Sequence, residues 1–185
     1  MSRTFLTKLH LIIAAFMFPA VLMFLVTGVL YTWGNKGEWI EDKASVQLEA
    51  PLAADEAALK AIAVDELDKR GLPVPSGSAS VSEAGEPVSL QWSGAKSEAS
   101  VKATDDPLVA EVTVKEATFH RNLVQLHKAK GSDLFKVYAS VLAFVLFLLV
   151  ASGLVLGLQV KALRRITLAS SVAGAVAFLG FFALG

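Results

Sequence analysis

The sequence predicts a membrane α-helical protein with three transmembrane helices and a small α+β domain inserted between the first and the second. Three observations predict this class. First, 54% of the 185 residues are hydrophobic, whereas the apolar share of soluble domains is about 45–50%. Second, many of these residues gather into three long runs. Third, the segment between the first two runs alternates apolar and polar positions, as strands do.

The three apolar runs are each long enough to cross a bilayer as a helix. The run 11–33 has no charge, the run 134–160 has only Lys136, and the run 166–185 has no charge. A helix needs about 20 residues to cross the hydrocarbon core. Each run therefore predicts one transmembrane helix.

Basic residues near the ends of these runs predict the orientation, because loops rich in Lys and Arg stay in the cytoplasm. Two basic residues precede the first run and three lie between the second and the third, namely Arg3, Lys8, Lys161, Arg164 and Arg165. We therefore expect a cytoplasmic N-terminus and residues 35–133 on the far side. The chain divides into a first transmembrane helix, an outer α+β domain, a helix that leads into the second transmembrane helix, and a third transmembrane helix, at 1–34, 35–118, 119–160 and 161–185.

The outer domain reads as one helix followed by about four strands. In "ADEAALKAIAVDELDKRGLP", Asp55 can cap the helix and Gly71 and Pro73 end it. An apolar stripe repeats at helical spacing, formed by Leu59, Ile62, Ala63 and Leu67. Period-two stretches follow, "SASVS", "PVSLQWS", "EASVKAT" and "LVAEVTV", separated by the turns "EAGEP", "SGAKS" and "TDDP". No phosphate loop, nucleophile motif or paired-carboxylate site lies in this segment.

The chain has three histidines, and all lie beside the apolar runs: His10, His120 and His127. The stretch "KEATFHRNLVQLHKAKG" reads as a helix that continues into the second run with a kink at Gly131. Two histidines seven residues apart rise about 10.5 Å along a helix, too far to chelate one zinc ion. One explanation of the histidines is that they simply occupy amphipathic positions at the membrane–water interface. Haem is another, because haem iron takes axial histidine in an apolar pocket, and the chain has no cysteine.

Within a single chain, histidines on opposite sides of the membrane cannot both bind the same haem. His10 begins the first run on the inner side, and His120 and His127 lie on the outer side, across a core of about 30 Å. A two-fold axis normal to the membrane would bring each histidine near its own copy. We therefore expect a homodimer with a haem at the interface.

Two segments resemble the PepSY-associated transmembrane family, and they cover about a third of the chain. They are "KLHLIIAAFMFPAVLMFLVTGVLYTW" and "LHKAKGSDLFKVYASVLAFVLFLLVASGLVLGL". Each pairs Leu-His with a later Ser/Thr-Gly, at Leu9-His10 with Thr27-Gly28 and at Leu126-His127 with Ser152-Gly153. The inserted domain is similar to a PepSY domain. Within the family, the chain resembles the small ferric reductases of the VciB type.

The resemblance implies a b-type haem protein of the bacterial inner membrane, ligated by His10 and His127, with His120 as a further candidate. It implies ferric iron as the substrate in the periplasm, ferrous iron for uptake as the product, and a cytoplasmic or quinol electron donor. Arg121 or Lys128 could pair with the haem propionates. Hard Fe(III) prefers oxygen ligands, which makes four acids candidates, Asp105, Asp106, Glu116 and Asp133. The alternative is a non-enzymatic, membrane-anchored PepSY accessory protein that binds a partner. No feature indicates nucleic-acid binding.

Overall fold

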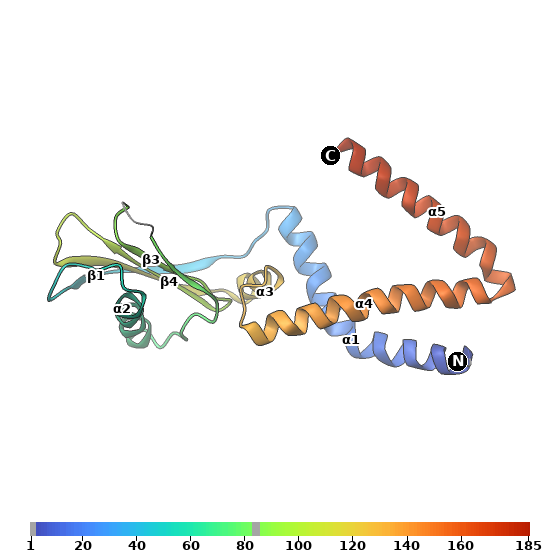
Figure 1. The fold of residues 1–185 in the computed structure, drawn as a ribbon, viewed down its shortest axis with the longest axis horizontal. Helices are drawn as coiled ribbons and strands as arrows, with labels where there is room; N and C mark the ends of the chain where they lie inside the picture. The colour runs from blue at the N-terminus through green and yellow to red at the C-terminus, as the bar shows by residue number, and fades with distance from the viewer. Residues whose placement is uncertain (1–2, 83–85) are drawn as a thin grey trace. The chain divides into compact units, whose positions relative to one another are not determined.

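The computed structural model describes residues 3–82 and 86–185, so the turn expected at 83–87 lies partly outside the described residues. The helices are α1 (Arg3–Thr32), α2 (Glu56–Lys69), α3 (Phe119–His127), α4 (Asp133–Gln159) and α5 (Lys161–Leu184) (Figure 1). The strands are β1 (Trp39–Gln47), β2 (Ala79–Val81), β3 (Ser89–Trp92), β4 (Ser97–Ala103) and β5 (Val109–Ala117). Contacts group residues 1–21 with 140–185 in one unit and residues 22–139 in another, and each unit is described by itself.

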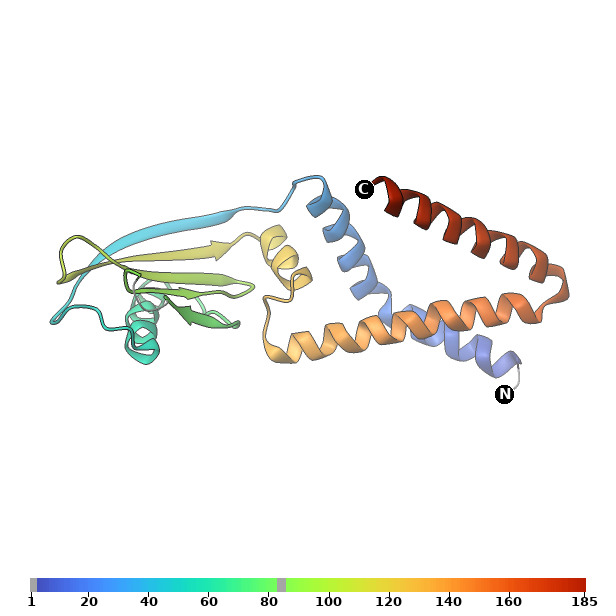
Figure 2. The ribbon, with the colours of Figure 1, turned by 45° about the horizontal axis from the view of Figure 1, so that its top comes forward.

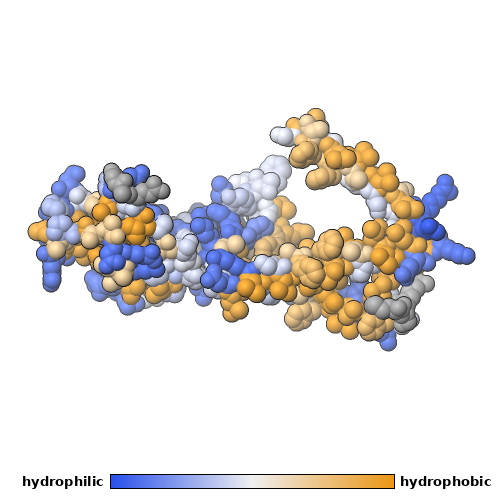
Figure 3. All heavy atoms as spheres, viewed as in Figure 1, coloured by the Kyte–Doolittle hydropathy of each residue, from blue (hydrophilic) through white to orange (hydrophobic). Residues whose placement is uncertain are grey.

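Three helices in the described part of the chain are long and apolar enough to cross a membrane, as the sequence predicts. They are Thr4–Thr32, Asp133–Gln159 and Lys161–Leu184. Their apolar side chains point outward: Phe144 and Phe147 of α4 and Phe181 of α5 are each more than 60% exposed. Apolar residues accordingly cover the surface of α4 and α5 (Figure 3). Such a surface needs lipid or another apolar partner.

The α+β domain between α1 and α4 is built on one five-stranded antiparallel sheet, within the described residues, in the order β1-β5-β4-β3-β2. β5 lies between β1 and β4, where Val112 faces Ala44 of β1 and Val101 of β4. Helix α2 covers one face of the sheet (Figure 2). The sequence predicted β2 to β5, and the structure adds β1 at the edge beside β5.

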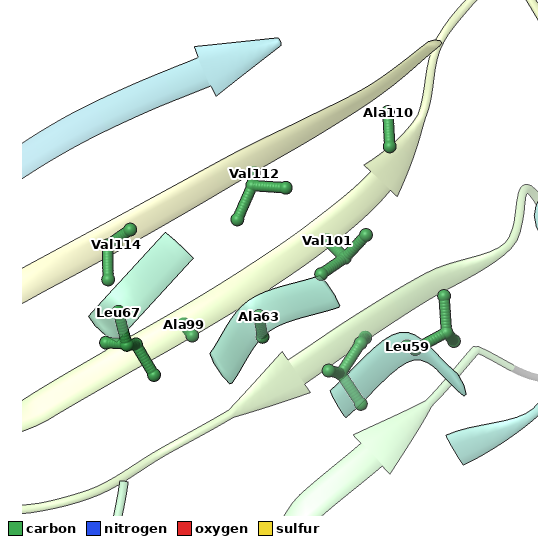
Figure 4. Packing of buried hydrophobic residues seen from close by; sticks show 9 residues of the cluster. Leu59, Ala63, Leu67, Ala99, Val101, Ala110, Val112 and Val114 are labelled. Carbon is green, nitrogen blue, oxygen red and sulfur yellow. The ribbon is translucent and has the colours of Figure 1, made fainter. Parts of the chain in front are cut away.

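The core of the domain lies between α2 and the sheet (Figure 4). Alternate residues of β3, β4 and β5 point toward α2, so the period-two pattern of the sequence becomes one buried face. The fully or nearly buried residues of this core are Leu59, Ala63, Leu67, Leu90, Ala99, Val101, Ala110, Val112 and Val114. The predicted helix cap is confirmed, because the Asp55 carboxylate accepts a hydrogen bond from the Ala57 amide at 3.1 Å. Gly71 ends the helix region with φ of +65°.

The segment between β5 and α4 differs from the predicted single helix. Strand β5 continues to Ala117, where it pairs with Trp39, so α3 begins only at Phe119. The Thr118 hydroxyl accepts from the Arg121 amide and caps α3. α3 ends at His127, and a turn containing Ala129 at φ of +57° separates it from α4. The expected continuous helix with a kink at Gly131 is therefore wrong, because the chain breaks the helix before that glycine.

Candidate functional site

His10 and Ser152 form a hydrogen-bonded pair between α1 and α4. The His10 Nδ1 atom lies 2.9 Å from the Ser152 Oγ atom. The Ser152 hydroxyl donates its single hydrogen to the Leu149 carbonyl at 3.0 Å. The serine oxygen must then accept from His10, which puts a proton on Nδ1, so that in the neutral imidazole the lone pair lies on Nε2. Neutral imidazole in that form is the form that binds metals.

His127 and Thr27 form the same arrangement between α3 and α1. The His127 Nδ1 atom lies 2.9 Å from the Thr27 Oγ1 atom. The Thr27 hydroxyl donates to the Met23 carbonyl one turn earlier, at 2.6 Å. Thr27 is 2% exposed, so its hydroxyl is shielded from water. The same reasoning puts a proton on Nδ1 of His127, so that in the neutral imidazole Nε2 is the acceptor.

The two repeated motifs are paired crosswise. Leu9-His10 belongs with Ser152-Gly153, and Leu126-His127 belongs with Thr27-Gly28. The sequence showed both motif copies but grouped each histidine with the hydroxyl of its own segment. The partners are instead 142 and 100 positions apart. The sequence signal that could have indicated these remote partners is that the two motif copies are alike. Each histidine could therefore pair with the hydroxyl of either copy.

The glycine of each motif lies beside the opposite imidazole. A Cβ on Gly28 would lie 3.3 Å from Cε1 of His127, and a Cβ on Gly153 would lie 3.7 Å from Cε1 of His10. The Phe24 ring also contacts His127, with ring centroids 5.1 Å apart. Glycine therefore keeps space free next to both rings.

A cavity of about 330 Å³ adjoins His10. Apart from His10 and Ser152, its lining is wholly apolar: Leu6, Leu9, Ile13, Val145, Leu148, Leu149, Ala151 and Val155. The volume lies at the lower end of the range for ligand sites. An apolar cleft with one imidazole whose Nε2 carries a lone pair fits the axial ligation of a haem. The residues present therefore suit the group that the sequence suggested.

His120 and Arg121 lie on α3 but outside the hydroxyl–imidazole pairs. The prediction that His120 and His127 share a helix is confirmed. The His120 Nε2 atom is buried and has no hydrogen-bond partner among the described residues. The Arg121 guanidinium lies 5.0 Å from the centroid of Trp39 and donates to the Lys36 carbonyl.

Two ammonium groups lie over the ring of Tyr31, one turn beyond Thr27. Lys36 Nζ is 5.2 Å and Lys128 Nζ is 5.8 Å from the ring centroid. Lys128 directly follows His127. Of the two basic residues expected to meet propionates, Lys128 thus lies next to a candidate ligand, whereas Arg121 is already held by Trp39.

The four acids expected to receive ferric iron do not lie together. Asp105 and Asp106 lie in the turn before β5, where the Asp106 carboxylate accepts from the Leu108 amide at 2.9 Å. Glu116 lies near the other end of β5, and Asp133 begins α4 and pairs with Lys136. No group of three or more metal-binding side chains occurs within residues 3–82 and 86–185. The iron-binding role of these acids stays a prediction.

A family model described as the PepSY-associated TM region matches residues 3–182, which is nearly the whole chain. No curated protein and no solved structure matches the chain.

Proposed function

Because the chain belongs to the PepSY-associated transmembrane family, we propose that it is a b-type haem protein of the bacterial inner membrane that passes electrons to periplasmic ferric iron. The observation that carries the proposal is the crosswise pairing. Both histidines have Nδ1 tied to a buried or half-buried hydroxyl, which reserves Nε2 for a metal. The proposed identity is a small ferric reductase of the VciB type.

In this proposal His10 and His127 are the axial ligands. A bound haem would supply a reversible one-electron change of its iron. Ser152 and Thr27 orient the imidazoles, and the apolar residues of α1 and α4 exclude water. Lys128 and Lys36 could meet the propionates beside His127.

A homodimer follows from the expected orientation. The basic residues indicate that His10 lies at the inner side and His127 at the outer side of the membrane, about 30 Å apart. Two histidines that face one ring must then come from two copies of the chain. A two-fold axis normal to the membrane would supply them.

The proposed reaction takes one electron for each Fe(III) reduced to Fe(II). A quinol, or a reductant in the cytoplasm, would be the donor. Outward electron movement across the whole membrane gains about 2.3 kcal/mol per 100 mV of inside-negative potential. Fe(II) would leave for a separate transporter.

A second candidate function is that of an accessory protein that binds a partner through the outer domain. The sheet face away from α2 favours it, because this face has a polar hollow of about 420 Å³. Its lining carries both charges, including Lys43, Lys102, Glu98 and Glu111. In that case the histidines would only hold the helices together.

The visible spectrum of detergent-purified protein from haem-replete cells tests the proposal. We expect a sharp Soret band that shifts on reduction with dithionite. His10→Ala and His127→Ala should each remove the haem absorbance of the side at which that histidine lies, because each removes the axial nitrogens there. The matched control His120→Ala should keep the wild-type spectrum. A colourless wild-type protein would contradict the proposal and leave the accessory function.

A further inference from the structure

We infer that the polar hollow on the sheet face away from α2 binds a small hydroxycarboxylate anion. We further infer that the ferric complex of this anion is the substrate, a step that rests on the proposed function. The hollow has a volume of about 420 Å³, which is within the range of small-molecule sites. All its lining residues belong to the unit 22–139.

The floor of the hollow is a row of uncharged polar side chains on four neighbouring strands. Ser80 lies opposite Gln91, which lies opposite Ser100. Ser100 in turn lies opposite Thr113. These residues alternate along their strands with residues that pack in or against the core, so their side chains point away from α2. The row therefore crosses the sheet at right angles to the strands.

These four side chains are available to a ligand. None of them has a hydrogen-bond partner among the described residues, and all four line the hollow. Ser80 and Gln91 are exposed, and Ser100 is half-buried. Hydroxyl and amide groups both donate and accept hydrogen bonds. The floor therefore suits a ligand that carries hydroxyl groups together with carbonyl or carboxylate oxygens.

The three carboxylates in the lining are already engaged. Two are paired with lysines of the hollow and one accepts from an amide: Glu41 with Lys115 at 2.6 Å, Glu111 with Lys43 at 3.7 Å, and Glu98 with Gln125 at 2.9 Å. A metal ion or a cationic ligand would have to displace these partners. The lining thus disfavours a cation.

Two lysines of the hollow have no carboxylate partner among the described residues, Lys102 and Lys130. Lys130 Nζ donates to the Ser93 hydroxyl at 3.4 Å, beside the end of β4 where Glu98 lies. Lys102 is four residues further along β4, about 13 Å away. The two ammonium groups belong to opposite ends of the floor, and their flexible stems can close on an anion with more than one carboxylate.

Other classes of ligand fit this lining less well. A lipid or an aromatic ring needs apolar surface, whereas the floor consists of hydroxyl and amide groups. Inorganic phosphate is too small to reach lysines at both ends. An extended peptide adds to a sheet at its edge, whereas the hollow lies on the face. A small hydroxycarboxylate has the hydroxyl and carboxylate oxygens for the floor and the negative charges for both lysines.

The same oxygens make this anion a carrier of iron, because hard Fe(III) prefers oxygen ligands. The hollow adjoins the part of α3 that carries His127. Gln125 of α3 donates to Glu98, and Lys130 follows His127 by three residues, which span at most about 11 Å. Fe(III) in the bound complex would take one electron from the reductant of the proposed reaction and become Fe(II), with no proton or group transferred.

Calorimetric titration of the full-length protein in detergent tests the site, with citrate and with gallium(III) citrate as a redox-inert form of the ferric complex. Wild type should bind both. Lys102→Met removes an ammonium group at similar length and should weaken binding roughly tenfold. Gln91→Met removes the amide at similar size and should weaken binding about fivefold. Gln91→Glu should weaken it more than Gln91→Met, because the added charge repels the anion.

Two controls keep the test specific. Lys96→Met makes the same substitution as Lys102→Met on the exposed β3–β4 turn, outside the hollow. It should leave the affinity nearly unchanged, because water and salt screen exposed charges. Inorganic phosphate should compete with citrate only weakly. Wild-type affinity in both Lys102→Met and Gln91→Glu would overturn the inference, and so would phosphate that competes as well as citrate itself.

The inference and the proposed function fail in different ways. If the protein has the expected haem spectrum but binds neither citrate nor gallium(III) citrate, only the anion site is wrong. If the protein is colourless but binds citrate in a way that depends on Lys102 and Gln91, the anion site stands and the proposed function is wrong.

Discussion

At the scale of single residues, the candidate site consists of two hydroxyl–imidazole pairs with the same chemistry. In both pairs the hydroxyl donates its hydrogen to a backbone carbonyl of its own helix. Ser152 donates to Leu149, and Thr27 donates to Met23. Of the two neutral tautomers of histidine, only the one with its hydrogen on Nδ1 can donate to that hydroxyl oxygen. This arrangement fixes a ligand nitrogen without using a charged group inside the membrane, where charges are costly.

Removing one hydroxyl tests this role. Thr27→Val keeps the shape of the side chain but leaves Nδ1 of His127 without its acceptor. We expect haem affinity at this site to fall about tenfold or more, as for other residues that orient metal ligands. The midpoint potential of the haem should also shift, because the basicity of its axial imidazole changes. Haem titration and a potentiometric titration measure the two effects.

The matched control is Thr27→Ser, which keeps the hydroxyl. It should retain haem affinity and potential close to those of wild type. Equal losses in the valine and serine variants would show that side-chain packing at Thr27, and not the hydroxyl, matters. Unchanged affinity and potential in Thr27→Val would contradict the positioning role.

At the scale of secondary-structure elements, an ionic network joins α2 to β1. Arg70 donates to the Asp42 carboxylate at 2.6 Å and also pairs with Glu66. Lys69 pairs with Glu66 at 2.6 Å. Hydrogen bonds from Lys69 and then from Arg70 hold the pKa of Glu66 below its ordinary value of 4.5. The hydrogen bond from Arg70 likewise lowers the pKa of Asp42.

This network predicts an acid-sensitive outer domain. A carboxyl group with a lowered pKa in the folded state stabilises the fold fully above its unfolded pKa, here 4.5 for Glu66. The stabilisation is lost as the pH falls from there through the folded pKa. Glu66→Gln removes the negative charge that Arg70 and Lys69 pair with, and should lower the free energy of unfolding at pH 7 by about 1–2 kcal/mol. The loss is not larger, because both partners are partly exposed and water screens the two ion pairs. The free energy of unfolding of this variant should also fall less steeply than that of wild type as the pH drops below 4.5.

Hydrogen exchange of the buried strand amides, such as those of Val101 and Val112, measures this stability in the full-length protein. Glu56→Gln is a suitable control, because Glu56 is exposed and pairs only with Lys60 among the interactions described for α2. It should change the exchange by a few tenths of a kcal/mol at most. An equal effect of both substitutions would contradict the network as the cause.

Some elements could be predicted from sequence and others could not, for physical reasons. Helix α2 and strands β2 to β5 carry a regular apolar period, because each buries one face against the core. Strand β1 lacks that period: Ile40 is 61% exposed, and three charged residues follow it. Its place in the sheet is set by backbone hydrogen bonds to β5, and these leave no pattern in the side chains of the sequence. The same pairing extends β5 to Ala117 and delays the start of α3.

The candidate site was predictable in its residues but not in its connections. The histidines were recognisable because they are few and lie beside apolar runs. Their hydroxyl partners are remote in sequence, and two equal motifs allow both possible pairings.

At the scale of the whole molecule, the orientation in the membrane can be tested because the chain has no cysteine of its own. A single cysteine introduced at exposed Ser80 of β2 should react with an impermeant maleimide in intact cells. A cysteine at exposed Ala162, beside the basic residues between α4 and α5, should react only after the membrane is permeabilised. The expected difference follows from retention of the basic loop in the cytoplasm.

Gel mobility or mass spectrometry of the labelled protein reads out this experiment. Both variants should label equally once detergent is added, which controls for reactivity. Labelling of Ala162→Cys but not Ser80→Cys in intact cells would reverse the orientation and put the outer domain in the cytoplasm.

The crosswise pairing also sets an order for biosynthesis. When α1 leaves the ribosome, it carries His10 and Thr27, and the partners of both are still untranslated. The Thr27 pair is completed once His127 has been made, and the His10 pair only after Ser152. A nascent chain therefore acquires its two oriented imidazoles in sequence, the one at His127 before the one at His10.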